Sequence, residues 1–221
     1  MTRQTIFITG AASGIGRATA LQFHARGWFV GAADVDQARL EVLKQDLDND
    51  CFTAYLDVTD KSAFDQVMND FGDAAGQRLD ILFNNAGIAD PRGVAAEQFD
   101  TETFNRIISV DLTGAFMYAR ECGRHMLERG SGSIVNICSI MASGGSENNV
   151  IGYAAAKGGL VNMTRQMGTE WADRGVRVNA VSPGFVVTEM TRPMLEAMGM
   201  DKWISSRTPM RRLGEVQEVT N

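Results

Sequence analysis

The sequence has few of the residues that build metal centres, disulfide frameworks and flexible linkers. Of its 221 residues, 4 are proline, 3 are cysteine and 2 are histidine. Cys51, Cys122 and Cys138 are odd in number and far apart, which argues against a disulfide framework or a zinc site and favours a reducing compartment. With His24 and His125 as the two histidines, a histidine-built metal site is not expected. We therefore predict a cytoplasmic protein without a bound metal.

Long apolar runs and basic clusters are missing as well. No run reaches the roughly 18 apolar residues of a membrane span, and the first ten residues, MTRQTIFITG, hold too short an apolar run for a signal peptide. The net charge is −6 and no dense group of Lys and Arg forms a basic face, which argues against a nucleic-acid partner. The 23 glycines, accompanied by so few prolines, indicate tight turns inside a regular fold.

Buried strands and helices are predicted to alternate along the whole chain. Apolar runs predict strands over 5–9, 28–33, 52–56, 79–83, 133–138 and 176–181. Helical spacing predicts helices over 14–26, 37–47, 61–71, 102–128 and 153–172, the fourth of them bent. This alternation is typical of an α/β fold with a doubly wound parallel sheet, which binds its ligands beyond the carboxyl ends of the strands. We predict one domain spanning residues 1–221.

The first strand runs into a glycine-rich turn. Gly10, Gly14 and Gly16, with Ser13 and Ile15 between them, stand between a buried strand and an amphipathic helix. Such a turn leaves bare backbone for a pyrophosphate and points a helix N-terminus at it.

Asp34 ends the second strand, where a carboxylate binds the hydroxyls of an adenosine ribose and repels a 2′-phosphate. We therefore expect NAD as the cofactor in preference to NADP. The alternative role of Asp34, capping the next helix, is one that Asp36 can fill.

Several further motifs occur in a fixed order, and with them the chain resembles the short-chain dehydrogenase/reductase family over essentially its whole length. The motifs are TGAASGIG at 9–16, Asp57 followed by Val58, NNAG at 84–87, Ser139, the YxxxK pair Tyr153 and Lys157, and Pro183-Gly184 leading to Thr188. The resemblance implies a Rossmann-like sandwich and hydride transfer between NAD(H) and a secondary alcohol or ketone.

Tyr153 is the expected general acid and base. A free tyrosine titrates near pH ~10 and is a poor base at neutrality. Lys157 lies four residues later on the same helix face, so its charge can stabilise the tyrosinate. Ser139, at a strand end, can bind the substrate oxygen as charge develops there.

The resemblance also implies the cofactor contacts. Asp57 and Val58 would hold the adenine, Lys157 would hold the nicotinamide ribose, and the segment after the sixth strand would bind the nicotinamide carboxamide. The full set of expected cofactor-binding residues is Gly10, Ser13, Gly14, Ile15, Gly16, Asp34, Asp57, Val58, Asn85, Ala86, Gly87, Tyr153, Lys157, Pro183, Gly184, Val186 and Thr188.

The chain departs from the family pattern in two places. Asp111 stands where the family usually has an asparagine that supports a helix kink and the proton relay near the lysine. Its carboxylate is either a tolerated isostere or a change that handicaps the relay, and we favour tolerance. Family members also usually continue with one more helix and a seventh strand, whereas this sequence ends at Asn221. We therefore expect six strands and a truncated C-terminus.

Residues 188–212 are expected to form a lid over the substrate, and their five methionines suit either a hydrophobic alcohol or ketone or the ordinary packing of two short helices. The leading prediction is an NAD-dependent dehydrogenase acting on CH–OH groups, with a homodimer or homotetramer implied by the family. Two alternatives stay open: an NADP-dependent 3-ketoacyl reductase, which Asp34 argues against, and a non-catalytic NAD(H)-binding sensor.

Overall fold

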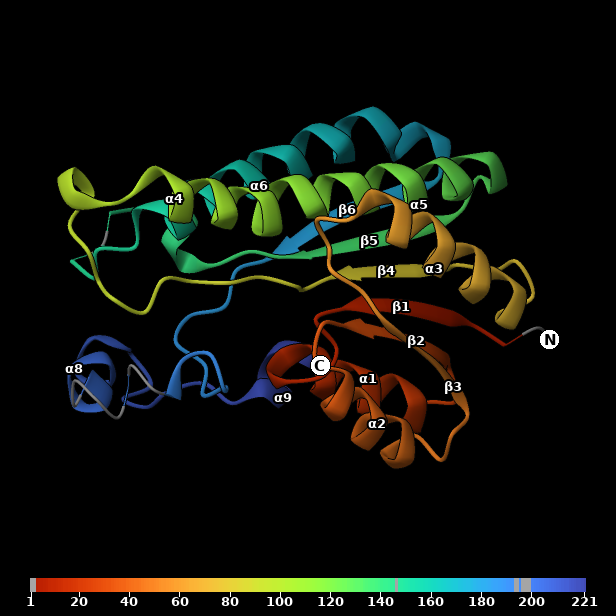
Figure 1. The fold of residues 1–221 in the computed structure, drawn as a ribbon, viewed down its shortest axis with the longest axis horizontal. Helices are drawn as coiled ribbons and strands as arrows, with labels where there is room; N and C mark the ends of the chain where they lie inside the picture. The colour runs from red at the N-terminus through yellow and green to blue at the C-terminus, as the bar shows by residue number, and fades with distance from the viewer. Residues whose placement is uncertain (1–2, 146, 193–194, 196–199) are drawn as a thin grey trace.

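Six parallel strands form one sheet in the computed structural model, which describes residues 3–145, 147–192, 195 and 200–221 (Figure 1). The strands lie in the order β3-β2-β1-β4-β5-β6. Their bounds are β1 Thr5–Thr9, β2 Phe29–Asp34, β3 Cys51–Tyr55, β4 Ile81–Asn84, β5 Gly132–Ile137 and β6 Val176–Val181. The order reverses between β1 and β4, so the chain leaves the centre of the sheet in both directions and opens a crevice there. The predicted doubly wound, six-stranded sheet is confirmed.

Helices cover both faces of the sheet (Figure 1). One face carries α1 (Gly14–Ala25) and α2 (Gln37–Asp46), and the other carries α3 (Lys61–Ala74), α5 (Ala115–Arg129) and α6 (Ile151–Trp171). Successive strand residues point to opposite faces. Ile6 and Ile8 therefore pack in the α1–α2 core, while Phe7 between them packs in the opposite core.

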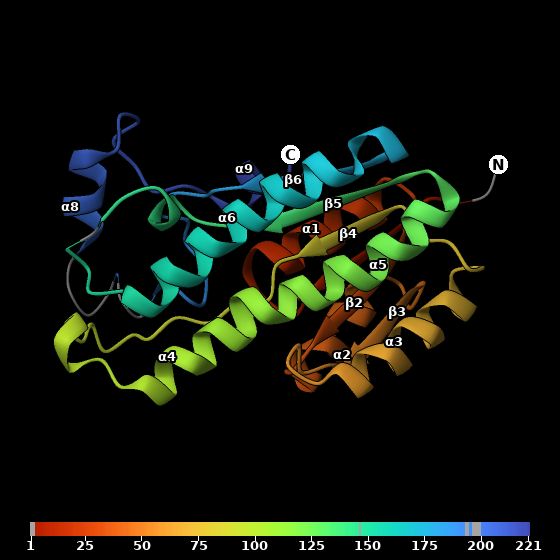
Figure 2. The same cartoon turned by 90° about the horizontal axis from the view of Figure 1, so that it is seen from above.

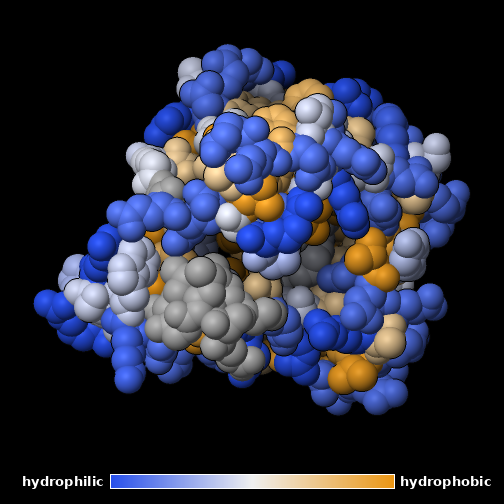
Figure 3. Space-filling model, turned by 60° about the vertical axis from the view of Figure 1, so that its left-hand side comes forward, coloured by the Kyte–Doolittle hydropathy of each residue, from blue (hydrophilic) through white to orange (hydrophobic). Residues whose placement is uncertain are grey.

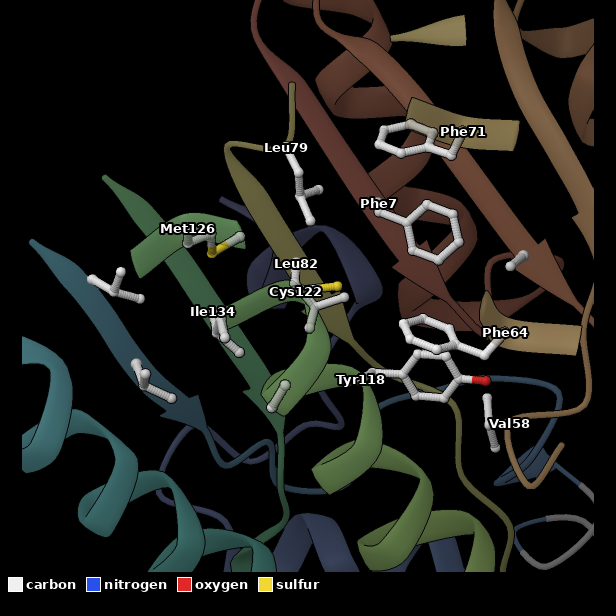
Figure 4. Packing of buried hydrophobic residues seen from close by; sticks show 14 of the residues in the cluster. Phe7, Val58, Phe64, Phe71, Leu79, Leu82, Tyr118, Cys122, Met126 and Ile134 are labelled. Carbon is white, nitrogen blue, oxygen red and sulfur yellow. The ribbon is translucent and has the colours of Figure 1, made fainter. Parts of the chain in front are cut away.

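The core beneath α3 and α5 is built around aromatic side chains (Figure 4). Phe7 meets Phe71 of α3 edge-on at 5.1 Å between ring centroids, and Phe64 meets Tyr118 of α5 edge-on at 4.1 Å. The Tyr118 hydroxyl points towards Val58, in the loop that follows β3. This core thus extends to the carboxyl end of the sheet.

A helical rod runs along this face as α4 (Thr101–Ile108), a π-helical turn (Ser109–Gly114) and α5 (Figure 2). The rod corresponds to the bent helix predicted over 102–128. Asp100 begins it, because its side chain accepts a hydrogen bond from the Thr103 N–H at 2.7 Å. The wide turn is the physical form of the bend, and it buries Asp111 on the side of the rod that faces α6.

The observed bounds of most predicted elements differ by one or two residues. The second strand starts at Phe29, and the last long helix starts at Ile151. Two short helices lie near the end of the chain, α8 (Met200–Arg207) and α9 (Val216–Thr220), of which α9 packs against α1. Of the expected lid, residues 193–194 and 196–199 lie outside the described residues. Among the described helices, none is long and apolar enough to cross a membrane.

Candidate active site

A cavity of about 410 Å³ opens at the carboxyl ends of the strands. Seen from the side of α8, the surface is hollowed near its centre, and hydrophobic residues lie among hydrophilic ones around the hollow (Figure 3). The predicted site residues that line the cavity are Gly10, Ser13, Gly14, Ile15, Asp34, Asp57, Val58, Asn85, Ala86, Gly87, Ser139, Tyr153, Lys157, Pro183, Gly184, Val186 and Thr188. Two predicted residues, Gly16 and Asp111, lie behind its wall.

The strand order arranges these residues along the crevice. Asp34 ends β2 and Asp57 follows β3, so both lie toward one end of the sheet. The glycine turn after β1 and Asn85 after β4 lie in the middle, and Ser139 after β5 lies toward the other end. The cavity therefore has an acidic end, a glycine-rich centre and an end with hydroxyl groups.

Close packing fixes the glycine turn. A side-chain carbon on Gly16 would collide with the Gly10 carbonyl oxygen, so this position has to be glycine for α1 to lie against the turn. The Asn85 amide donates to the Gly10 carbonyl oxygen at 2.9 Å and so ties the turn to the end of β4. The Gly14 N–H donates to the Glu189 carboxylate at 3.0 Å, which shows that the start of α1 receives an anionic group.

Asp34 organises the loop around it. Its two carboxylate oxygens accept the backbone N–H groups of Ala12, at 2.9 Å, and of Asp36, at 3.0 Å. The helix cap is Asp36, which accepts the Arg39 N–H at 3.0 Å. Asp34 is thus free of the capping role and lies on the cavity wall.

The loop after β3 forms the far end of the crevice. Asp57 accepts hydrogen bonds from the Thr59 N–H at 2.9 Å and the Thr59 hydroxyl at 2.7 Å, which holds the loop in a tight turn. Arg106 of α4 and Lys157 are the two cationic side chains among the described residues of the lining.

The wall of the cavity near β5 and α6 carries the three predicted catalytic side chains. Ser139 follows β5, and Tyr153 and Lys157 lie on α6. Ser139 is 8% exposed, and its hydroxyl accepts the Met141 N–H at 3.2 Å. The Lys157 ammonium lies 5.4 Å from the centroid of the Tyr153 ring and donates to the Ile137 carbonyl oxygen at 3.0 Å. The helical spacing of four residues thus places the positive charge beside the phenol, as predicted.

Asp111 forms an ion pair with Lys157. Its Oδ2 lies 3.1 Å from Lys157 Nζ, and its Oδ1 accepts the Ile88 N–H at 2.8 Å. A side-chain carbon on Gly87 would come within 2.8 Å of Asp111 Oδ2 and 3.3 Å of Lys157 Nζ. Glycine at position 87 therefore leaves the space in which the pair forms.

The segment after β6 is stabilised by hydroxyl groups. Thr191 donates to the Val186 carbonyl oxygen at 2.6 Å and accepts the Thr188 N–H at 3.0 Å. These bonds fold the segment into a turn that presents Thr188 and Met190 to the cavity.

Sequence reasoning missed several lining residues. Cys138 is 2% exposed and also borders the cavity. Thr59 adjoins the predicted Val58, and this neighbourhood is the available signal, whereas Met190 and Thr191 fall within the lid expected over 188–212. Arg106 had none, because its position depends on how the α4–α5 rod crosses the sheet. The other lining residues missed are Val35, Leu56, Ile88, Val110 and Ile137.

Comparison with known proteins gives consistent matches. Residues 10–221 match the family described as Enoyl-(Acyl carrier protein) reductase. The chain is 37% identical over 216 residues to cis-4-hydroxycyclohexanecarboxylate dehydrogenase of Sinomonas cyclohexanicum, covering 96% of this chain and 84% of that protein. It is 36% identical over 215 residues to 3-oxoacyl-(acyl-carrier-protein) reductase FabG of Thermotoga maritima, covering 96% and 85%.

Solved structures share the fold. The structure of ElxO with NADP bound superposes with a TM-score of 0.89 at 30% identity, covering 99% of this chain and 88% of that one.

Proposed function

The chain belongs to the short-chain dehydrogenase/reductase family, whose oxidoreductases use a nicotinamide dinucleotide, and on that premise we propose that it transfers hydride between NAD(H) and a secondary alcohol or ketone. The observation that carries the proposal is the meeting of Ser139, Tyr153 and Lys157 on one wall of the crevice that begins at the glycine turn. Tyr153 is the general acid and base of the reaction.

The crevice suits a dinucleotide in shape and charge. The glycine turn lines the cavity with Gly10, Ser13 and Gly14 at the start of α1, where a helix N-terminus favours a pyrophosphate. Asp34 and Asp57 lie at the adenosine end, where a 2′-phosphate would meet negative charge. NAD is for this reason the proposed cofactor, held by the turn, by Asp57 and Val58, by Asn85–Gly87 and by the segment from Pro183 to Thr188.

In alcohol oxidation, Tyr153 takes the hydroxyl proton, and NAD, when bound, would supply the hydride acceptor. The Lys157 ammonium stabilises the tyrosinate and reaches the side of the nicotinamide ribose. Ser139 donates a hydrogen bond to the substrate oxygen and holds it near the phenol. In ketone reduction, Tyr153 returns the proton to the same oxygen.

The substrate end favours an apolar alcohol or ketone. Ile88, Val186 and Met190 contribute apolar surface to the cavity. The chain is similar to cis-4-hydroxycyclohexanecarboxylate dehydrogenase, so a cyclic secondary alcohol is the first substrate to test. A second candidate, NADP-dependent reduction of a 3-oxoacyl thioester, is favoured by the similarity to FabG and by the NADP-bound neighbour. Asp34 argues against it.

A substrate panel and one variant test the function. NADH formation would be followed over cyclic and open-chain secondary alcohols, with small polyols and a 3-oxoacyl thioester plus NADPH as alternatives. Tyr153→Phe removes the proton-carrying hydroxyl, so we expect kcat to fall at least about 1000-fold while the Kd for NADH, measured by fluorescence, stays within about twofold. Cofactor binding without turnover by the wild-type chain would support the sensor alternative, and turnover retained in Tyr153→Phe would refute the role of Tyr153.

The proposal includes a cytoplasmic homo-oligomer. The three cysteines are free, which agrees with a reducing compartment. Light scattering on the purified protein would give the number of subunits, and a monomer at micromolar concentration would contradict this part of the proposal.

A further inference from the structure

The ion pair between Asp111 and Lys157 is buried in the wall of the active site. Asp111 is 0% exposed and Lys157 is 3% exposed. Each partner is also held by the backbone: Asp111 by the Ile88 N–H, and Lys157 by the Ile137 carbonyl oxygen. Neither charged group can turn away to solvent, so the electrostatic effect of the carboxylate on the site is permanent.

The groups around the pair keep the lysine protonated. Burial disfavours the ammonium, but the Asp111 carboxylate, followed by Tyr153, outweighs it and raises the pKa of Lys157. Burial raises the pKa of Asp111, while Lys157 and the Ile88 N–H oppose the change. Cys138, which follows β5, is a further titratable neighbour of Lys157, and burial raises the pKa of its thiol, so it adds no charge near neutrality.

The carboxylate changes what Lys157 does for Tyr153. An ammonium beside a phenol favours the tyrosinate. A carboxylate 3.1 Å from that ammonium offsets part of its effect on the phenol, because a negative charge close to a positive one weakens the field of the positive charge. In a site of intermediate dielectric, one such charge several ångströms away shifts a titration by about one pH unit.

We propose that Asp111 is a positioning residue that offsets the charge of Lys157 and thereby keeps the proton on Tyr153 to a higher pH. The inference rests on the proposed function of the site. The carboxylate favours the phenol over the tyrosinate, and the phenol is the form that donates the proton in ketone reduction. The carboxylate at position 111 therefore influences the pH range over which each direction of the reaction proceeds.

Tyrosinate absorbance in the ultraviolet tests this without turnover, because the chain has only three tyrosines. Tyr55 is 58% exposed, and Tyr118 is 1% exposed with a pKa that burial and the Asp57 charge raise well above the ordinary value. Subtracting the titration of Tyr153→Phe leaves the step of Tyr153. We expect Asp111→Asn to move this step down by about one pH unit, with circular dichroism showing at each pH that the protein stays folded.

The matched control is Asp80→Asn. Asp80 is also an ion-paired carboxylate, 2.6 Å from Arg78, but it lies at the amino end of β4 and away from the cavity. We expect it to leave the Tyr153 step in place. Should Asp111→Asn fail to fold, Asp111→Ser, which removes the charge and demands less space, is expected to give the same downward shift. A step that stays in place or moves up in the folded Asp111 variant overturns the proposal.

Activity profiles separate this inference from the proposed function. The pH of half-maximal alcohol oxidation is expected to fall by about one unit in Asp111→Asn, whereas a purely structural role would change the rate at every pH alike. If the Tyr153 absorbance step shifts in Asp111→Asn but the protein turns over no alcohol, the charge effect of Asp111 is supported and the proposed function is refuted. Turnover of alcohol by Asp111→Asn with an unshifted pH profile would support the proposed function and refute the charge effect of Asp111.

Discussion

At the scale of single residues, the proposed preference for NAD over NADP rests on the carboxylate of Asp34. This carboxylate is held by the N–H groups of Ala12 and Asp36, so it cannot swing aside to admit a 2′-phosphate. We expect Asp34→Ala to raise the ratio of kcat/KM with NADP to kcat/KM with NAD by at least about tenfold, because a repulsion on the order of 1.4 kcal/mol is removed. Initial rates with both cofactors measure the ratio.

Asp36→Ala is the control for this change, because Asp36 lies two residues away and caps α2 without lining the cavity. It should lower stability and leave the cofactor ratio within about twofold. An unchanged ratio in Asp34→Ala would show that the NAD preference has another source.

At the scale of elements, the π-helical turn between α4 and α5 couples the rod to the cofactor end of the crevice. A side-chain carbon on Gly114 would come within 2.9 Å of the Val58 carbonyl oxygen. Gly114→Ala should therefore displace Val58 and raise the Kd for NADH about fivefold, on the order of 1 kcal/mol, in a fluorescence titration. Gly158→Ala is the matched control, since the nearest atom to its added carbon is 3.9 Å away. Equal effects of both variants would refute a specific role for Gly114.

This turn also shows where the sequence stops being informative. The strands and most helices follow from apolar periodicity, and the glycine turn, Asp34 and the Tyr153–Lys157 spacing follow from local geometry. The sequence predicts a bend between 102 and 128, but its form depends on how the rod packs across the sheet. For the same reason Arg106, on that rod, could not be assigned to the cavity in advance. From the sequence, a buried carboxylate at position 111 can either pair with Lys157 or alter the proton relay, and whether the pair forms depends on how α6 packs against the turn.

At the scale of the whole molecule, the carboxyl ends of the strands form the site, whereas ion pairs at the amino end of β4 stabilise the fold. The cavity lies at the carboxyl ends, whereas Asp80 at the amino end of β4 joins Arg78 at 2.6 Å, Arg129 at 3.4 Å and the Thr5 N–H at 2.9 Å. Burial opposes the charge of Asp80, but the Arg78 hydrogen bond and the other partners outweigh it and lower the pKa of this carboxyl. The ionised form is therefore the one that stabilises the fold.

Asp80→Asn should accordingly reduce stability and spare catalysis. We expect the free energy of unfolding to fall by roughly 2 kcal/mol at neutral pH, which lowers Tm by about 5 °C, with kcat/KM within about twofold of the wild type. Because the folded-state pKa is lowered, the stabilisation is present above the ordinary carboxyl pKa of about 4 and is lost as the pH falls through the lowered value. The Tm difference between the two proteins should shrink over that acidic range in scanning calorimetry. A difference that persists unchanged at low pH would mean that packing, and not the ionised carboxylate, makes Asp80 important.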